Sequence, residues 1–346
     1  MARTAALIGT GMVARTHLLA LRDAPGVTLG AISSRRPETA QNFAQMAEAE
    51  TGAQPRILAD AEAVAADPTI DLAILVTPPN ARLDLLRPLF VAQKPVLLEK
   101  PIARNTAEAA EIVALSEAHG APLAIVMQHR ARAASRKAAE LVVSGNLGAL
   151  GLAEIAVPWW RDQSYYDEPG RGSYARDGGG VLISQAIHTI DLALSLTGPV
   201  NSVTAIAATT RFHQMEAEDV AAAGLTFANG ATGWLTASTA SFPGAAETIT
   251  LHYDKASLHL GEGVLKVFWR DGRTESFGAS ASTGGGADPM AFTHDWHQSV
   301  LEDFLDALDA GRPPLAPPRE VLHSHAMIDA ITGSARAGRT ISVETP

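Results

Sequence analysis

The chain has 346 residues, 47% of them apolar and 18% charged, which excludes a disordered or collagen-like protein and indicates about two domains. Its 27 basic and 37 acidic side chains give a net charge of −10, which disfavours nucleic acid or anionic lipid as partners and favours small molecules. Apolar stretches such as residues 72–76 are far shorter than the ~20 residues of a membrane helix, and the N-terminus lacks a signal-peptide pattern, so we expect a cytoplasmic protein.

The first third of the chain alternates short aliphatic stretches with longer Ala- and Glu-rich ones. Strands are predicted over residues 5–9, 27–32, 72–76, 95–99 and 123–127, and helices over 17–24, 37–50, 82–92 and 106–119. Strands that alternate with helices form right-handed βαβ units on a parallel sheet. We therefore predict an α/β, doubly wound domain over residues 1–125.

The rest of the chain, residues 126–346, has longer strands joined by short turns. Strands are predicted over residues 152–157, 200–210, 219–227, 232–241, 247–253, 256–260 and 264–269, with a hairpin turn at 228–230, so we expect a large, mostly antiparallel sheet. Helices predicted over residues 181–196 and 294–310 should pack on one face of this sheet. A last helix, predicted over about residues 320–333, should pack either on that face or back against the first domain. The other face also carries apolar residues, which predicts a homodimer or homotetramer. Residues 280–287 are predicted to form a flexible loop.

A glycine motif lies between the first strand and the first helix. Gly9 would allow a tight turn, Gly11 would let a pyrophosphate approach the backbone, and Ala14 would allow close packing, while the helix N-terminus favours phosphate charge. The alternative is a glycine-rich turn with no ligand.

The second predicted strand ends at Ser33, Ser34, Arg35 and Arg36, where an NAD-binding domain usually carries an acidic residue for the ribose. Guanidinium groups suit a 2′-phosphate, so the sequence favours NADP over NAD. The alternative is that both arginines merely begin a solvated helix.

Two further positions are candidates for acid–base chemistry. Lys100 follows a predicted strand at the edge of the sheet where α/β folds bind ligands, and a rigid proline follows it. On the helix after three glycines, Ser184, His188 and Asp191 share one predicted polar face, and the carboxylate could orient the imidazole. A solvated lysine and a structural histidine are the alternatives.

These features together resemble the Gfo/Idh/MocA oxidoreductase family across nearly the whole chain. The residues that carry the resemblance are the motif at 9–14, Thr77-Pro78, Glu99-Lys100-Pro101, Gln128-His129-Arg130 and the His188–Asp191 helix. The resemblance implies an N-terminal Rossmann domain, NAD(P)-dependent hydride transfer and oligomers formed through the C-terminal sheet. It implies that Lys100 and His188 are catalytic, with Asp191 near the substrate. The cofactor residues expected are Gly9, Thr10, Gly11, Met12, Val13, Ser33, Ser34, Arg35, Arg36, Thr77, Pro78, Asn80, Glu99, Lys100 and Gln128.

Two positions depart from the family pattern. An aspartate frequent four residues before the histidine is Ser184 here, so a Lys-Asp-His relay is incomplete and a proton would move through water or the substrate. A histidine common after the Thr77–Asn80 segment is Arg82 here.

An insert rich in aromatic and arginine residues precedes the polar helix and suits stacking on a sugar or a planar ring. An aromatic plug at a domain or subunit junction is the alternative. The expected substrate-binding residues are Trp159, Trp160, Arg161, Tyr165, Tyr166, Arg171, Tyr174, His129, Ser184 and Asp191. The histidines at 294, 297, 323 and 325 lack a carboxylate–histidine pattern in the sequence, so no metal site is expected.

The sequence therefore predicts an enzyme that moves hydride between NADP, or NAD, and a secondary alcohol or ketone of a sugar, cyclitol or related polyol. Lys100 would polarise the oxygen and His188 would exchange its proton. The alternatives are a dehydrogenase of a cyclic dihydrodiol carboxylate from aromatic breakdown and, in another class, a non-catalytic regulator that senses NADP.

Overall fold

The computed structural model describes residues 2–280, 286, 290 and 292–344, and its contacts group the chain into two compact units. Unit 1 comprises residues 1–103, 107–128 and 294–319, and unit 2 comprises 104–106, 129–293 and 320–346. Residues 104–106 aside, the chain passes from unit 1 to unit 2 after Gln128, and the predicted domain boundary lies after residue 125. It returns to unit 1 over residues 294–319, which the prediction had assigned to the second domain.

Unit 1 is built on a parallel sheet of six strands in the order β3-β2-β1-β4-β5-β6. Strand order reverses between β1 and β4, and a doubly wound sheet binds its ligand outside the carboxyl ends of the strands at such a point. The predicted Rossmann-type architecture is therefore confirmed. The strands are β1 (Arg3–Ile8), β2 (Val27–Ser33), β3 (Arg56–Leu58), β4 (Leu72–Leu75), β5 (Val96–Glu99) and β6 (Leu123–Val126).

One helix of unit 1 belongs to the C-terminal part of the sequence. Helix α9 packs on α1 and contacts β6, so the prediction that it covers the antiparallel sheet was wrong. An amphipathic pattern shows which face of a helix is buried but not which element buries it. The helices are α1 (Ala14–Asp23), α2 (Pro37–Thr51), α3 (Ala61–Ala66), η1 (Pro79–Ala81), α4 (Arg82–Val91), α5 (Thr106–His119) and α9 (Asp295–Ala310).

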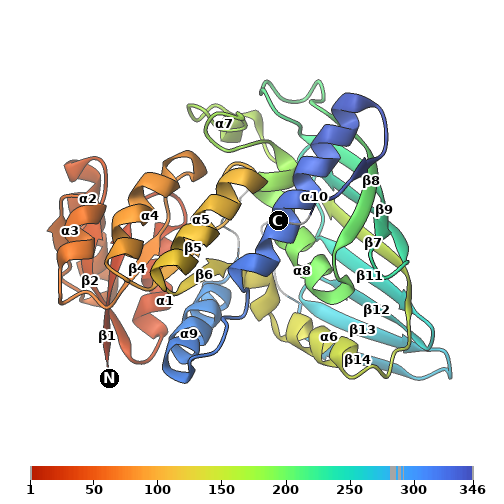
Figure 1. Ribbon diagram of the computed structural model, residues 1–346, viewed down its shortest axis with the longest axis horizontal. Helices are drawn as coiled ribbons and strands as arrows, with labels where there is room; N and C mark the ends of the chain where they lie inside the picture. The colour runs from red at the N-terminus through yellow and green to blue at the C-terminus, as the bar shows by residue number, and fades with distance from the viewer. Residues whose placement is uncertain (1, 281–285, 287–289, 291, 345–346) are drawn as a thin grey trace. The chain divides into compact units, whose positions relative to one another are not determined.

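Unit 2 contains a sheet of nine strands in the order β14-β13-β12-β11-β7-β10-β9-β8-β15. Figure 1 labels β7, β8, β9 and β11 to β14 of this sheet. All neighbours pair antiparallel except β7 and β10, which confirms the predicted, mostly antiparallel sheet. The strands are β7 (Leu150–Pro158), β8 (Val200–Ala208), β9 (Val220–Phe227), β10 (Thr232–Ser238), β11 (Thr248–Tyr253), β12 (Ala256–Gly261), β13 (Val264–Trp269), β14 (Thr274–Gly278) and β15 (Ile341–Ser342). The predicted turn at 228–230 joins β9 to β10, with Gly230 at a φ of 89°.

The two faces of this sheet differ in burial. Helices α6 and α8 pack on one face, where Ala221, Leu225 and Leu235 are buried, whereas Ile206, Trp234 and Phe268 are exposed on the other. The helical elements are η2 (Gln128–Ala131), α6 (Ala133–Val143), α7 (Gln163–Tyr166), the π-turn η3 (Leu182–Ala186), α8 (Ile187–Thr197) and α10 (Pro318–Ala337).

Among the described residues, none of the helices combines the length and the apolarity needed to cross a membrane. Most of the loop predicted over residues 280–287 lies outside the described residues.

Candidate functional site

The glycine motif after β1 forms a cradle at the point where strand order reverses. Gly9 adopts a φ of 102°, and a Cβ on it would lie 3.1 Å from the backbone carbon of Val76 and from the Thr77 side chain. Both facts restrict position 9 to glycine. The first turn of α1 carries no acidic residue. A pyrophosphate could therefore approach this backbone and the helix N-terminus, as the sequence predicts.

The end of β2 lies beside this cradle. The hydroxyl of Ser34 contacts the hydroxyl of Thr10 at 3.2 Å and that of Thr39 at 2.7 Å, while Ser33 is buried and Arg35 and Arg36 are exposed. Two exposed guanidinium groups thus lie where a dinucleotide fold places the adenosine ribose.

The segment that carries Lys100 ends β5. Glu99 is buried, and its carboxylate accepts a hydrogen bond from the backbone N–H of Lys100 at 3.1 Å. The other carboxylate oxygen lies 2.8 Å from His17 Nε2 on α1 and 3.4 Å from His297 Nε2 on α9. Burial alone would raise the pKa of Glu99, but the hydrogen bonds from both imidazoles outweigh it and hold that pKa well below its usual range. Burial lowers the pKa of His297, which favours its neutral form.

His17, Glu99 and His297 could in principle hold a metal ion, because their ligand atoms all lie within 4.8 Å of one another. The prediction rejected His297 as a ligand for want of a carboxylate–histidine partner in the sequence, yet the fold brings one from α1 and β5. Metal-bound histidines usually donate their second ring nitrogen to an acceptor, whereas His17 Nδ1 finds no partner among the described residues. The geometry therefore favours two imidazole donors on one carboxylate.

In unit 2, the glycines before the polar helix pack against protein backbone. A Cβ on Gly178 would lie 2.3 Å from the carbonyl oxygen of Arg104, and one on Gly180 would lie 1.8 Å from that of Glu218. The Glu218 carboxylate also accepts hydrogen bonds from the backbone N–H groups of Gly180 and Leu182 at 3.2 Å. Gly178 and Gly180 thus allow the backbones of Arg104 and Glu218 to approach closely. Glu218 was not predicted from the sequence.

The helix itself begins with the π-turn, which the prediction did not foresee. The i, i+4 spacing that placed Ser184 on the same face as His188 assumes a regular α-helix, and a π-turn changes the register between them. Ser184 is half-buried and His188 is buried.

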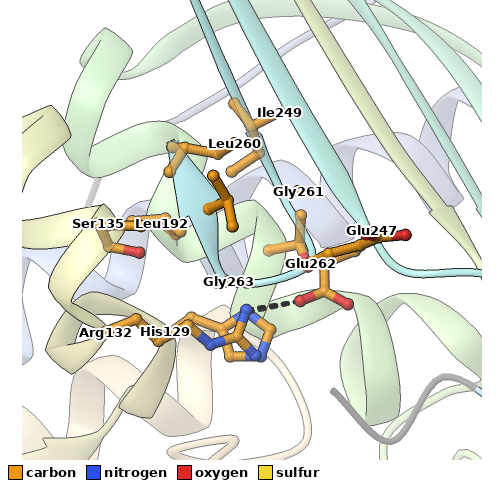
Figure 2. Close-up of a pocket in the computed structure, with 13 residues that line it drawn as sticks. His129, Arg132, Ser135, Leu192, Glu247, Ile249, Leu260, Gly261, Glu262 and Gly263 are labelled. Atoms are coloured by element: carbon orange, nitrogen blue, oxygen red, sulfur yellow. Dashed lines mark hydrogen bonds and ion pairs between the residues drawn. The ribbon is translucent and has the colours of Figure 1, made fainter. Parts of the chain in front are cut away.

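His188 stacks on His129, with ring centroids 4.9 Å apart and an angle of 26° between the planes. His129 Nδ1 lies 3.9 Å from a carboxylate oxygen of Glu247, and Arg132 donates to the same oxygen at 2.6 Å. Figure 2 shows His129, Arg132 and Glu247 around a cavity of about 20 Å³, which has room for a single water. Glu247 and Arg132 were not predicted, because no local motif marks them.

Asp191 pairs with Arg130, which the sequence analysis names only as part of the Gln128-His129-Arg130 motif. Arg130 donates two hydrogen bonds to the Asp191 carboxylate, at 2.7 and 2.9 Å, and a third to Glu320 at 2.9 Å. Burial alone would lower the pKa of Arg130, but Asp191 raises it above its ordinary value. The main described partner of Asp191 is thus a guanidinium group, where the prediction paired it with His188.

The aromatic insert is partly an internal core. Trp159, Arg161 and Tyr166 are buried, and Tyr166 makes a 2.6 Å hydrogen bond with Thr239. Arg171 lies over the Tyr165 ring at 4.5 Å. Of the predicted substrate-binding residues of the insert, Trp160, Tyr165, Arg171 and Tyr174 are half-buried and keep surface for a ligand. The remaining predicted cofactor residues of unit 1 include exposed Met12, Pro78 and Asn80, half-buried Val13 and Thr77, and buried Gln128.

Comparison with known proteins decides the family. Residues 3–127 match the family described as "Oxidoreductase family, NAD-binding Rossmann fold", and residues 135–259 match "GFO/IDH/MocA C-terminal domain". The chain belongs to the Gfo/Idh/MocA family. It is therefore an oxidoreductase with an NAD-binding Rossmann domain, as the resemblance implied.

Three relatives illustrate the range of this family. The chain is 26% identical to D-apiose dehydrogenase of Paraburkholderia graminis over 358 residues, which cover 98% of this chain and 89% of that one. It is 26% identical over 237 residues to trans-1,2-dihydrobenzene-1,2-diol dehydrogenase of Mus musculus, covering 68% of each. The WlbA dehydrogenase of Bordetella pertussis, solved in complex with NADH and UDP-GlcNAcA, shares 27% identity with a TM-score of 0.83, covering 99% of this chain and 98% of that one.

Proposed function

We propose that the protein is a dehydrogenase that prefers NADP and acts on a secondary alcohol, or the corresponding ketone, of a sugar, cyclitol or related polyol. The observation that carries the proposal is Lys100, which directly follows β5 at the ligand-binding edge of the NAD-binding unit. The D-apiose dehydrogenase and the sugar nucleotide bound to WlbA support a carbohydrate-like substrate.

The cofactor fits unit 1. The Gly9 backbone leaves no room for a Cβ, and the N-terminus of α1 is free of acidic side chains, as a bound pyrophosphate requires. When bound, the nicotinamide accepts or supplies a hydride at C4. Exposed Arg35 and Arg36 support NADP, because a 2′-phosphate gains charge-assisted bonds from guanidinium groups.

Two side chains would do the proton chemistry. In the oxidative direction the substrate loses a hydride from carbon and a proton from oxygen. The Lys100 ammonium group would donate a hydrogen bond to that oxygen, and His188 would take its proton. The reverse reaction uses the same groups with the proton returned to oxygen. The half-buried side chains of the aromatic insert, Trp160, Tyr165, Arg171 and Tyr174, would contact the substrate together with His129, Ser184 and Asp191.

The experiment is a screen of wild-type protein with NADP and NAD against a panel of sugars, cyclitols and cyclic diols. Lys100→Met and His188→Asn should each lower turnover of the accepted substrate by ~10²-fold to 10⁴-fold, because each removes a group that handles the proton. Lys255→Met, which removes an exposed lysine of the turn between β11 and β12, is the matched control and should keep wild-type turnover. Binding of NADPH, followed by its fluorescence, should persist in Lys100→Met. An unchanged rate in Lys100→Met would exclude Lys100 from the mechanism.

The same screen tests the alternatives. Turnover of cyclic dihydrodiols but not of sugars would favour the second substrate class, which the mouse relative supports. Tight NADPH binding with no turnover of any member would favour a regulator that senses NADP.

We also propose that the protein is a homo-oligomer through the open face of the nine-stranded sheet. The exposed Ile206, Trp234 and Phe268 on that face support this arrangement, because a second copy that covers the face would remove these apolar side chains from water.

A further inference from the structure

Arg82 is the first residue of α4, and its guanidinium group is buried beneath the carboxyl ends of β4 and β5. Only 2% of the residue is exposed. Nε and Nη2 donate to the carbonyl oxygen of Thr77 at 3.0 and 2.9 Å, Nη2 donates to that of Lys100 at 3.3 Å, and Nη1 donates to that of Glu99. One side chain therefore joins the segment after β4 to both carbonyl groups that flank the Lys100 backbone.

A guanidinium group suits this task because its donors lie in one rigid plane. Carbonyl groups at the end of a parallel sheet have left the strand ladder and need other donors when they are buried. A neutral imidazole at this position would have a single N–H and could serve one carbonyl group only. Burial lowers the pKa of Arg82 to about 9, so the group remains charged at neutral pH.

The Lys100 backbone is held from its N–H side as well. The Glu99 carboxylate accepts that N–H, and it is itself fixed by His17 and His297. Arg82 supplies the matching hold on the carbonyl side. The backbone that carries Lys100 is thus constrained on both sides by buried groups.

We propose that Arg82 is a positioning residue for Lys100, which fixes the Lys100 backbone relative to the Thr77 segment. The inference rests on the proposed function, in which Lys100 must hold the reacting oxygen while the Thr77 segment contacts the cofactor. Arg82 itself touches neither in this account. Loss of the Arg82 side chain should displace the Lys100 ammonium group by up to about 1 Å. A displacement of about 1 Å lowers the rate by on the order of 10²-fold.

The test compares Arg82→Met and Arg82→Lys with Arg87→Met. Arg87 lies on the same helix, is exposed and makes a 4.0 Å surface contact with Glu111, so its variant controls for a lost arginine on α4. Arg82→Met should lower kcat by about 10²-fold with the KM values for substrate and cofactor within about threefold of wild type. Arg82→Lys keeps the charge and some donors and should fall in between. Arg87→Met should match wild type.

Hydrogen exchange supplies a readout that needs no substrate. In peptides that cover residues 96–104, Arg82→Met should exchange faster than wild type and Arg87→Met should not, while peptides from β9 and β10 should be unchanged. If the wild type turned over no substrate, the proposed function would fail, and this exchange pattern would still decide whether Arg82 holds the segment. The inference is overturned if Arg82→Met keeps the wild-type kcat and exchange, or if it raises KM with kcat unchanged. Should Arg82→Met not fold, Arg82→Lys carries the same two readouts, and wild-type values for both would overturn the proposal.

Discussion

The buried ion pair between Arg130 and Asp191 allows a quantitative prediction about the interior of unit 2. The two side chains are 8% and 1% exposed and share two hydrogen bonds at 2.7 and 2.9 Å. Arg130→Met leaves the carboxylate buried with Ser324 Oγ, 3.5 Å away, as a weak remaining partner. Breaking a buried pair from one side costs about 3–5 kcal/mol, because the other charge stays desolvated without its counter-ion.

A double variant separates this penalty from the value of the pair itself. In Arg130→Met with Asp191→Leu no buried charge is left unpaired, so the free energy of unfolding should recover to within about 2 kcal/mol of wild type. The third bond of Arg130 reaches Glu320, whose side chain is 55% exposed. Glu320→Gln should therefore change the free energy of unfolding by no more than about 1 kcal/mol and serves as the control.

Urea unfolding followed by tryptophan fluorescence suits this measurement. Four of the five tryptophans, at 159, 160, 234 and 269, belong to unit 2, so the signal reports mainly on that unit. Additive costs in the double variant, or a single-variant cost below about 1 kcal/mol, would refute the assignment of a mutually dependent buried pair. Kinetics of Asp191→Asn add a second test: a fall in kcat with little loss of stability would instead support the predicted role of Asp191 in orienting His188.

Three further expectations concern the cofactor, acid stability and assembly. Arg35→Ala with Arg36→Ala should raise the KM for NADPH more than that for NADH, and an equal effect on both would end the phosphate interpretation; Arg87→Ala is the control. The lowered folded-state pKa of Glu99 means that its ionised form stabilises the protein at pH values above its ordinary pKa of 4.5, and that this contribution is lost as the pH falls through the folded-state pKa. The difference in unfolding free energy between wild type and Glu99→Gln should therefore be largest near pH 7 and shrink below pH 4.5, and a constant difference would contradict the assignment. Trp234→Glu should reduce the mass measured by light scattering if the open sheet face is the interface, and an unchanged mass would exclude that face.

The sequence predicted the features of this fold that depend on local pattern. Alternating apolar strands and helices indicated the parallel sheet, because both faces of such a sheet are covered and its strands are continuously apolar. The Gly9 prediction was specific because a tight turn directly after a strand restricts one position to glycine. Strands β3, β14 and β15 were missed, since they lie at sheet edges and contain no buried residue, so they give no clear apolar pattern.

The packing partners of the predicted elements could not be deduced as well from the sequence. Helix α9 has a clear apolar face, and that face fits α1 as well as it would fit a sheet. At the start of the π-turn before α8, the backbone N–H groups of Gly180 and Leu182 donate to the carboxylate of Glu218, which lies 38 and 36 residues further along the chain. A helical pattern read from residues 181–196 alone contains no trace of that contact.

The residues that hold Lys100 show how far a sequence argument could have gone. Glu99 ends a strand that was predicted to be buried, and a buried carboxylate must find donors, so the existence of such donors follows from the sequence. Their identity does not, because His17 and His297 belong to helices whose packing was not known. Arg82 differs from both, because the resemblance had already singled it out as a departure from an expected histidine. Its partners could not be deduced, since the three carbonyl groups that it binds converge only in the folded chain.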